Sequence, residues 1–465
     1  MISKIFFNNK WKDSLSKKIF TRKSLTDNNI FKYSECNSKD VERVTKSAKM
    51  GLENNKKLSR YKISNYLKKI SIKINKNKSK LAKLQSQETG KPLNQSIKEV
   101  EYSVKLWFFA SKAAKNKINY RVFCKKDTYA NIISEPVGIV ALIIPWNYPI
   151  VVTSERLPFI LAAGNSVIIK PSEYASQAII FLLKIINEVR PPLGTINMIT
   201  GSRILGQKLV ENSYVNMVSF TGSTKVGKVI MSICAKSIKR VSLELGGKNS
   251  IIVLKDANIE KAVQAVIDGF TSNAGQACVG TSKLIIDKKI YNNFVIRLIK
   301  KLNLKKINYG PITTNKQYQN ILKILKKNKK FNKKIIYGSF NKNKKMIMSP
   351  IVYSGLPNNS DLNKIELFAP ILTITKFSSI NKAIDLANDT EYGLASVIYS
   401  KKLSTAKKVA SEIKAGRIWI NNSVKNNYAN VPIGGFKQSG LNRECGLEGI
   451  KTYSEIKSVI INEKK

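Results

Sequence analysis

The sequence contains an uninterrupted apolar run, Gly138-Ile139-Val140-Ala141-Leu142-Ile143-Ile144, that leads directly into Pro145-Trp146-Asn147-Tyr148-Pro149. A short apolar run of this kind is typical of a strand that is covered on both faces. The carboxyl end of such a strand is where α/β folds bind ligands. Asn147, fixed between two prolines, is therefore a candidate donor to a developing oxyanion, where one amide contributes about 3–4 kcal/mol. Its alternative interpretation is a simple turn residue.

Strand and helix patterns alternate through the rest of the chain. Short strands are predicted at residues 197–200, 217–220, 241–245 and 250–254, and helices at 174–189 and 259–270. Upstream, residues 40–115 have a helical pattern that is broken at Gly90 and Pro92, and a strand pattern begins after Tyr120. This alternation predicts an α/β fold on a parallel, doubly wound sheet. Residues 320–347, rich in Lys, Asn and Ile, are interpreted as a surface helix and loop.

The composition is that of a globular protein with two or three domains. The chain has 465 residues and a hydrophobic fraction of 43%, which allows more than one core and excludes general disorder. No apolar run reaches the roughly 18 residues of a transmembrane helix, and residues 1–20 lack the apolar centre of a signal peptide. We therefore expect no membrane association and a cytoplasmic location. The five cysteines are widely spaced and histidine is absent, so neither disulfides nor a metal site is predicted.

The net charge of +51 has two interpretations. Nucleic acid is the usual partner of so basic a chain. However, Lys is far commoner than Arg, and the basic residues are scattered among Asn and Ile, as in Asn75-Lys76-Asn77-Lys78. These three residue types have codons made of A and T alone, so a biased genome accounts for the charge. We predict no specific nucleic-acid partner; a functional polyanion-binding surface is the alternative.

One further segment has the features of a ribose site. Lys170-Pro171-Ser172-Glu173 follows the apolar run 167–169, and a Lys and a Glu at the end of a strand can hold the ribose hydroxyls of an adenine dinucleotide. A solvated loop is the alternative interpretation.

Another segment, residues 220–228, has the features of a phosphate site. Gly222 and Ser223 open a helix there and expose backbone N–H groups to a phosphate. The spacing up to Lys228 imitates a P-loop, but Val229 stands where the Mg²⁺ ligand Ser or Thr is required. Nucleotide hydrolysis is therefore not predicted.

A cysteine and a glutamate form the candidate reaction centre. Because the chain has no histidine, thiol chemistry must use another base, and a carboxylate acting on water is the obvious substitute. Glu244 lies in Leu243-Glu244-Leu245-Gly246-Gly247-Lys248, and Cys278 ends Asn273-Ala274-Gly275-Gln276-Ala277-Cys278. A thiol can attack a carbonyl, hydride loss then leaves a thioester, and activated water releases an acid. This chemistry requires the two side chains to be close, with water between them; a capping Glu and a buried Cys are the structural alternatives.

These segments together resemble the NAD(P)-dependent aldehyde dehydrogenase superfamily, in which they occur in the same order. The segments are Pro145–Pro149, Lys170–Glu173, Phe220–Gly227, Glu244–Lys248, Asn273–Cys278, Glu366-Leu367-Phe368-Ala369-Pro370 and Pro432-Ile433-Gly434-Gly435-Phe436-Lys437-Gln438-Ser439-Gly440. The resemblance implies Cys278 as nucleophile, Glu244 as general base, Asn147 as oxyanion donor and Glu444 as an aid to proton relay. The cofactor-binding residues that it implies are Ile143, Pro145, Trp146, Lys170, Ser172, Glu173, Phe220, Gly222, Ser223, Val226, Leu245, Gly246, Glu366 and Phe368. NAD is expected rather than NADP, because Glu173 would repel the 2′-phosphate of NADP.

The resemblance also implies three parts. A Rossmann-like NAD-binding domain would comprise residues 1–116 and 136–246, and an α/β catalytic domain residues 247–437. A small β extension, residues 117–135 and 451–465, would make a homodimer or homotetramer through a hairpin and a C-terminal strand at 456–462. The departures from the family pattern are Lys225 for Glu, Ser250 for Pro, Arg156 for a relay Lys, Asn442 for Gly, a shortened stretch at 302–311 and no Asn-Pro near residue 28.

The expected reaction is oxidation of an aldehyde to a carboxylic acid with NAD. A CoA-acylating enzyme is an alternative, although acylating relatives usually lack the base at Glu244. The second alternative is a basic protein that has lost catalytic activity and binds polyanions. For the substrate, Trp107, Phe108, Phe109 and Tyr148 are candidates to line an access tunnel, or are core residues. With Glu155 they would suit the quaternary ammonium of betaine aldehyde; succinic semialdehyde is equally compatible.

Overall fold

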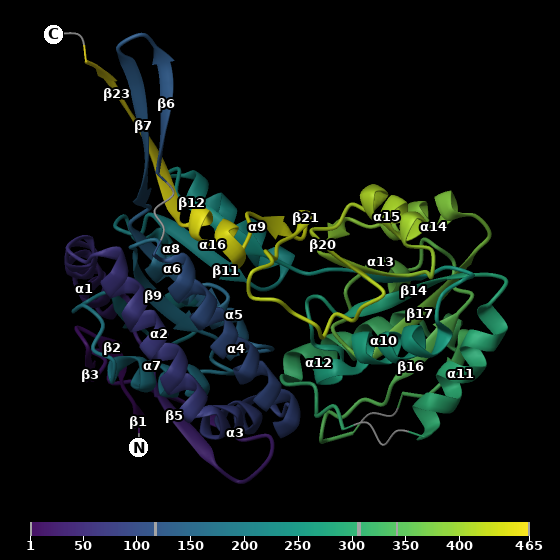
Figure 1. The fold of residues 1–465 in the computed structure, drawn as a ribbon. Coiled ribbons are helices and arrows are strands. Elements are labelled where there is room, and N and C mark those ends of the chain that lie inside the picture. Colours follow the sequence, from purple (N-terminus) through teal and green to yellow (C-terminus); the bar gives the residue numbers. More distant parts are fainter. Residues whose placement is uncertain (1, 116–118, 305–307, 341–342, 464–465) are drawn as a thin grey trace.

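The molecule consists of two α/β lobes and a narrow antiparallel sheet that projects from the first lobe (Figure 1). The computed structural model describes residues 2–115, 119–304, 308–340 and 343–463. Parts of the sequence predictions therefore lie outside the described residues: the boundary at 116–118, the centre of the shortened stretch (305–307), positions 341–342 and the last two residues, 464–465.

The first lobe is built on an eight-stranded sheet. Its strands are β2 (Ile5–Phe7), β3 (Lys10–Lys12), β8 (Ile139–Ile144), β9 (Ser166–Pro171), β10 (Ile196–Met198), β11 (Met217–Thr221), β12 (Arg240–Glu244) and β22 (Gly440–Leu441). Their order is β22-β12-β11-β8-β9-β10-β2-β3. The five strands from β12 to β10 pair in parallel, and the three others are antiparallel. The predicted doubly wound parallel sheet is confirmed, whereas the N-terminal pair β2–β3 was not predicted.

Helices cover both faces of this sheet, which explains the apolar run of β8. One face is covered by α2 (Arg60–Lys76), α3 (Lys78–Thr89), α4 (Leu93–Ala113), α5 (Pro149–Ser154), α6 (Leu157–Ala162), α7 (Gln177–Asn187) and α16 (Gly446–Thr452). The other face is covered by α1 (Ser38–Lys56), α8 (Arg203–Glu211) and α9 (Thr224–Ala235). Val140, Leu142 and Ile144 pack into the first core, and Ile139 and Ala141 into the second. Because alternate residues of a strand point to opposite faces, neither set can be polar.

Helix α3 ends at the predicted break, Gly90, and a carboxylate in its last turn joins it to α7. Gly90 adopts a left-handed φ of 73° after the last turn of α3, a conformation that glycine tolerates best. In that last turn the buried carboxylate of Glu88 accepts from the backbone N–H groups of Ser176 (3.2 Å) and Gln177 (2.6 Å) at the start of α7. It also accepts from the Tyr33 hydroxyl. One carboxylate therefore holds three elements together.

The second lobe is built on a seven-stranded sheet. Its strands are β13 (Asn249–Val253), β14 (Thr281–Asp287), β15 (Ile335–Tyr337), β16 (Ile351–Ser354), β17 (Ile371–Phe377), β19 (Ala395–Tyr399) and β20 (Arg417–Ile420). Their order is β15-β16-β17-β14-β13-β19-β20, parallel except for β15. Its helices are α10 (Ile259–Thr271), η1 (Ser272–Gly275), α11 (Tyr291–Leu304), α12 (Asn315–Lys327), η2 (Lys329–Lys334), α13 (Asp361–Lys364), α14 (Ile380–Asn388) and α15 (Leu403–Glu412).

The described residues of the predicted helix-and-loop region, 320–340 and 343–347, form more regular structure than the sequence predicts. Helix α12 buries Tyr318, Ile321 and Leu325 against the second lobe. The following segment contributes β15, which pairs antiparallel with β16 at the edge of the sheet. A surface helix and loop was therefore an incomplete prediction, because three half-buried residues surrounded by Lys and Asn carry no clear strand pattern.

The projecting sheet comprises β6 (Tyr120–Lys125), β7 (Thr128–Pro136) and β23 (Ser454–Asn462), in the order β23-β7-β6. The strand predicted at 456–462 is thus part of β23, and it pairs antiparallel with β7 along its whole length. Two small sheets complete the fold: β1 (Ile2–Ser3) with β5 (Ile30–Ser34) and β4 (Ile19–Lys23), and β18 (Tyr392–Gly393) with β21 (Phe436–Lys437). Among the described residues, no helix combines the length and the apolarity needed to cross a bilayer.

Replacement of Glu88 tests the junction of α3 and α7. Glu88→Ala leaves two backbone N–H groups and one hydroxyl without their acceptor, and each such buried donor costs about 1–3 kcal/mol. We expect the free energy of unfolding, measured by chemical denaturation, to fall by at least about 2 kcal/mol. Glu42→Ala, at an exposed position of α1, is the matched control and should change it by less than about 0.5 kcal/mol. Equal effects of the two substitutions would contradict this account.

Candidate active site

The candidate site lies where turns of the first lobe meet a loop of the second. Strands β8 and β12 are parallel members of the first sheet, so their carboxyl ends lie at the same edge. Asn147 follows β8, and Glu244 is the last residue of β12. Cys278 comes from the second lobe, between η1 and β14. Three residues far apart in sequence are thereby brought to one place.

The loop that carries Cys278 has a strained backbone. Asn273 and Ala274 adopt left-handed conformations, with φ of 50° and 55°, and Gly275 follows with φ of 73°. A Cβ on Gly275 would lie 2.2 Å from the carbonyl carbon and oxygen of Ala369. Only glycine fits this close approach, which ties the loop to the Glu366–Pro370 segment. Strain of this kind persists where surrounding contacts hold it.

Side-chain amides supply those contacts. Asn249 Nδ2 donates to the Cys278 carbonyl (2.6 Å) and to the Gly280 carbonyl (3.1 Å). Asn147 Nδ2 donates to the Gln276 carbonyl (3.2 Å), and Asn273 Nδ2 donates to the Asn147 carbonyl (3.1 Å). Asn147 therefore lies against the loop that carries Cys278, and one of its two amide N–H groups helps to hold that loop in place. Sequence reasoning missed Asn249, although its place directly after Gly-Gly-Lys was a usable signal.

Cys278 and Glu244 adjoin each other directly. Cys278 keeps some accessible surface, yet it lies deep enough that burial raises the pKa of its thiol well above the usual value, and the charge of Glu244 raises that pKa further. Burial also raises the pKa of Glu244, while Arg156 and a hydrogen bond from the Cys278 thiol lower it. Each group therefore influences the ionisation of the other, as the predicted proximity of Cys278 and Glu244 requires. Glu244 Oε1 has no hydrogen-bond partner among the described residues.

Arg156 brings three carboxylates together beneath this pair. It is fully buried between α5 and α6. Its guanidinium nitrogens lie 3.4 Å from Glu155, 3.5 Å from Glu244 and 3.8 Å from Glu444. Glu444, predicted to assist proton relay, also accepts from the Ser242 hydroxyl (2.6 Å) and from the Tyr453 hydroxyl (2.9 Å). The sequence singled out Arg156 only as a departure from a family pattern, because its partners come from three separate segments.

The residues predicted for the adenosine and phosphate groups lie along the same edge of the first sheet. Lys170 lies near the carboxyl end of β9 and Ser172 follows that strand, and Lys170 Nζ is 4.0 Å from the half-exposed carboxylate of Glu173. Gly222 and Ser223 precede α9, whose Ser223 hydroxyl caps the N–H of Val226. The first turn of α9 contains Lys225 and no acidic residue, so the replacement of Glu by Lys makes this helix end more attractive to a phosphate. This donor set fits an adenine dinucleotide. Three other residues are predicted to bind the cofactor. Ile143 and Phe220 lie near the ends of β8 and β11, and Pro145 directly follows β8.

The residues predicted for the nicotinamide half link the two lobes. Glu366 Oε1 accepts from the Gly247 N–H (3.2 Å), and a Cβ on Gly246 would lie 2.3 Å from Glu366 Oε2. Burial raises the pKa of Glu366 to about 7. Phe368 packs edge-on against Trp146, with ring centroids 5.7 Å apart. Leu245 and Gly246 bond to Ser439 through their backbone groups, at 2.9 Å and 2.6 Å.

Two departures from the family pattern have simple structural explanations. Asn442 adopts a left-handed φ of 69°, and Asn is the residue besides glycine that best tolerates it. Ser250 lies in the central strand β13 and shares a hydrogen bond of 2.9 Å with the Ser396 hydroxyl of β19.

The aromatic residues proposed for an access tunnel are mostly engaged elsewhere. Trp107 is fully buried and donates to the Ser154 hydroxyl (3.1 Å), and Phe109 packs against Phe159. Lys91 Nζ lies 3.6 Å from the centroid of the Tyr148 ring, so a cation already covers that ring face. Phe108 is exposed. These residues therefore form no aromatic cage for a quaternary ammonium.

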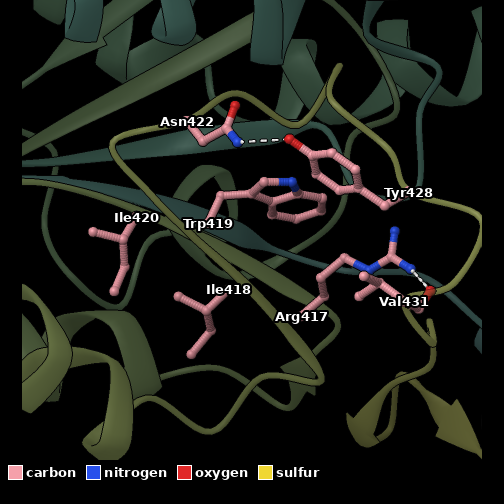
Figure 2. Close-up of a pocket in the computed structure, with 7 residues that line it drawn as sticks. All are labelled: Arg417, Ile418, Trp419, Ile420, Asn422, Tyr428 and Val431. Atoms are coloured by element: carbon pink, nitrogen blue, oxygen red, sulfur yellow. Dashed lines mark hydrogen bonds between the residues drawn. The ribbon is translucent and has the colours of Figure 1, made fainter.

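A separate cavity of about 200 Å³ lies beside β20 (Figure 2). It is lined by Arg417, Ile418, Trp419, Ile420, Asn422, Tyr428 and Val431. Arg417 Nη2 donates to the Val431 carbonyl (2.7 Å), and Asn422 Nδ2 donates to the Tyr428 hydroxyl (3.3 Å). Cys278, Glu244 and Asn147 do not line this cavity. Arg417 lines this cavity and also acts on the candidate active site through its charge. Burial raises the pKa of Glu155 and Glu244, and the positive charge of Arg417 opposes that rise.

Comparisons with known proteins agree with this geometry. A family model described as "Aldehyde dehydrogenase family" matches residues 11–459. The chain is 34% identical to "Aminoaldehyde dehydrogenase 2, peroxisomal" of Pisum sativum, over 98% of this chain and 95% of that protein. It is 32% identical to "Aldehyde dehydrogenase [NAD(P)+] 1" of Saccharomyces cerevisiae, with coverage of 98% and 95%.

Solved structures are similar over the whole chain. The NAD-dependent aldehyde dehydrogenase of Sinorhizobium meliloti superposes with a TM-score of 0.97 at 29% identity, covering 100% of this chain and 95% of that one. The betaine aldehyde dehydrogenase of Staphylococcus aureus in complex with NAD⁺ gives 0.94 at 29% identity, with the same coverage.

The fold, the site and these similarities define an oxidoreductase that acts on aldehydes with a nicotinamide cofactor. The chain belongs to the aldehyde dehydrogenase family. It oxidises an aldehyde to the acid with NAD(P).

Gly275→Ala tests the close approach of the nucleophile loop to Ala369. The substitution adds both left-handed strain, about 1–2 kcal/mol, and a clash with backbone. Gly355→Ala is the matched control, because Gly355 has a similar φ of 72° and its Cβ would meet nothing nearer than Lys334 Nζ at 3.9 Å. We expect Gly275→Ala alone to lower kcat for aldehyde oxidation, by about 10²-fold as for a misplaced reactive group. Comparable kcat values for the two variants would show that the clash is irrelevant.

Proposed function

We propose that Cys278 is the nucleophile, Glu244 the general base and Asn147 the oxyanion donor of a hydrolytic aldehyde dehydrogenase. The observation that carries the proposal is the proximity of the Cys278 thiol to the buried carboxylate of Glu244, each of which shifts the pKa of the other, beside the amide of Asn147. A carboxylate so placed can take a proton from the thiol and later from water.

The proposed sequence begins with proton transfer from Cys278 to Glu244, because the raised pKa of the thiol keeps it protonated at rest. The sulfur attacks the aldehyde carbon, a C–S bond forms, and Asn147 Nδ2 donates to the resulting oxyanion. NAD, when bound, supplies the acceptor for the hydride that this carbon loses. Cys278 then carries a thioester. Glu244, after passing its proton toward Glu444, takes another from water, whose oxygen attacks the thioester and releases the acid and the thiol.

The cofactor would be held along the edge of the first sheet. Lys170 and Glu173 are proposed for the adenosine ribose, and the N-terminal turn of α9, with Gly222 and Ser223, for the pyrophosphate. Glu366 and Phe368 are proposed for the nicotinamide half. The half-exposed carboxylate of Glu173 disfavours the additional phosphate of NADP.

The substrate is proposed to be a small aldehyde, and the acyl acceptor is proposed to be water rather than CoA. Retention of Glu244 next to the thiol supports water as the acyl acceptor. Names of relatives include aminoaldehyde and betaine aldehyde dehydrogenases. The engagement of Tyr148 by Lys91 and of Glu155 by Arg156 gives no support to a quaternary ammonium in particular.

We further propose the three-part division into a cofactor domain (1–116 and 136–246), a catalytic domain (247–437) and an oligomerisation extension (117–135 and 451–465). The membership of the three main sheets supports it. The extension is proposed to form a homodimer or homotetramer. Its strand β23 is an edge strand with exposed Ile456 and Ile460, and β20 is the edge strand of the second sheet. Exposed apolar edges of this kind are typical of strand-to-strand association. The free state of all five cysteines supports a cytoplasmic location.

Cys278→Ser tests the assignment of the nucleophile. A hydroxyl in place of the thiol is a far weaker nucleophile beside the same base, so turnover should fall below about 10⁻³ of the wild-type value, with an unchanged melting temperature. NADH absorbance over a panel of short aldehydes identifies the substrate. The amounts of free acid and acyl-CoA formed with and without CoA identify the product. Unchanged activity would refute the nucleophile, and acyl-CoA formed in preference to free acid would refute the hydrolytic reaction.

Substitution on β23 tests the proposed assembly. Ile456→Lys combined with Ile460→Lys places two charges on an apolar edge and should shift the protein to monomers in light scattering. Ile204→Lys, at an equally exposed position of α8, is the control and should leave the mass unchanged. A double variant that keeps the native assembly would exclude β23 from the interface.

A further inference from the structure

Arg156 is the cation of a buried charge cluster that lies directly behind the reacting groups. Its three carboxylate neighbours come from separate segments. Glu155 lies at the end of α5 and Glu244 at the end of β12. Glu444 lies in an isolated antiparallel backbone pairing with Ile433. All four side chains are nine-tenths or more buried. An ion pair with this little solvent is not screened as a surface pair is.

The guanidinium is a fixed charge. Burial lowers its pKa, but the three carboxylates together raise it above its ordinary value, so it does not release a proton at any working pH. Nη1 donates to the Val152 carbonyl (3.1 Å) and to Glu155, which sets its orientation. Nη2 and Nε, which face Glu244 and Glu444 at 3.5 and 3.8 Å, complete no aligned hydrogen bond among the described residues. Toward Glu244, Arg156 therefore acts chiefly through its charge.

The charges around Glu244 do not balance. Three carboxylates face one guanidinium; Arg417 adds a second cation nearby, and the Cys278 thiol and the Tyr453 and Tyr102 hydroxyls face the cluster uncharged. Burial raises the pKa of Glu155 to about 7, and it does the same for Glu366, a further carboxyl group that interacts with Glu244. Burial works on Glu244 in the same direction, and Arg156 is the strongest influence that opposes it. Without that cation, the pKa of Glu244 would rise further.

We propose that Arg156 is a positioning residue whose fixed positive charge keeps Glu244 ionised and directed at Cys278, and that it carries no proton during turnover. The proposal rests on the assignment of Glu244 as general base. It assigns to Arg156 a role that a proton-carrying side chain could not fill, because a group that released its proton would remove the very charge that Glu244 depends on.

The pH profile of turnover tests the proposal. The base acts in its ionised form, so the acid limb of kcat follows the pKa of Glu244 in the loaded enzyme. An opposite charge within about 4–6 Å lowers a carboxyl pKa by roughly 1–3 units, and removal of it in Arg156→Met should move the acid limb up by that amount. Arg156→Lys keeps the charge and should restore the native limb. An acid limb that stays in place in an active Arg156→Met enzyme would overturn the proposal.

A second substitution predicts the opposite sign and guards against loss of folding. Glu444 is a negative neighbour that raises the pKa of Glu244. Glu444→Gln, nearly isosteric and still able to accept from Tyr453, should move the acid limb down. If Arg156→Met does not fold, Arg156→Lys and Glu444→Gln decide the matter: a native limb in the first and a lower limb in the second support the proposal. A raised limb in Arg156→Lys, or no movement in Glu444→Gln, contradicts it.

Rapid mixing separates a failure of this proposal from a failure of the assigned base. NADH is formed before the thioester is hydrolysed, so an enzyme with an impaired base shows a burst of about one NADH per site followed by slow turnover. Glu244→Gln removes the negative charge that raises the pKa of the Cys278 thiol, so the thiol can release its proton to water and the burst should appear at every pH. Arg156→Met should show the burst only below its raised acid limb. A Glu244→Gln enzyme with native steady-state turnover would refute Glu244 as base. A burst in Glu244→Gln with pH-independent behaviour of Arg156→Met would refute only the role of Arg156.

Discussion

The amide of Asn249 is the interaction on which the site depends. Glu244 ends a strand of one sheet, and Cys278 precedes a strand of another, so nothing in either sheet alone sets their separation. Asn249 begins β13 directly after the Gly-Gly-Lys turn, and its Nδ2 holds the carbonyls of Cys278 and Gly280, while its Oδ1 accepts from the Ala395 N–H (2.9 Å). The same short segment therefore leaves Glu244, crosses to the second lobe and holds Cys278 in place. A side chain on Gly246 or Gly247 would collide with Glu366 or Asn249, which explains why this crossing is made of glycine.

Behind this junction, the site is dominated by charge held out of water. A thiol, three carboxylates and a guanidinium share a region where burial shifts Cys278, Glu244 and Glu155 toward their neutral forms. Such an arrangement is not favourable to stability, because desolvation of buried ions opposes their mutual attraction. It persists because the two apolar cores on either side of the first sheet and those of the second lobe are large and continuous. The chemistry benefits, since charges in a dry and fixed environment act strongly on a reacting carbonyl.

The sequence predicted those features that depend on local pattern. The apolar run of β8 indicated a strand covered on both faces, and the cores on the two sides account for each of its residues. The family and fold followed from motifs that are themselves short. What the sequence did not predict is non-local: the pairing of β2 with β10, the edge strand β15, and the amide contacts of Asn249. The carboxylate partners of Arg156 could not be predicted from the sequence, because an ion pair between distant segments leaves no periodic pattern in it.

The most direct measurement of the central claim is the identity of the covalent intermediate. The Glu244→Gln enzyme, mixed with NAD and an aldehyde and quenched in acid, should gain the mass of one acyl group per chain, on the peptide that contains Cys278. Glu244 is the group held responsible for releasing that acyl group, so the adduct should persist in the variant and vanish in the wild type. Free acid formed at the native rate with Cys278 unmodified would contradict the account.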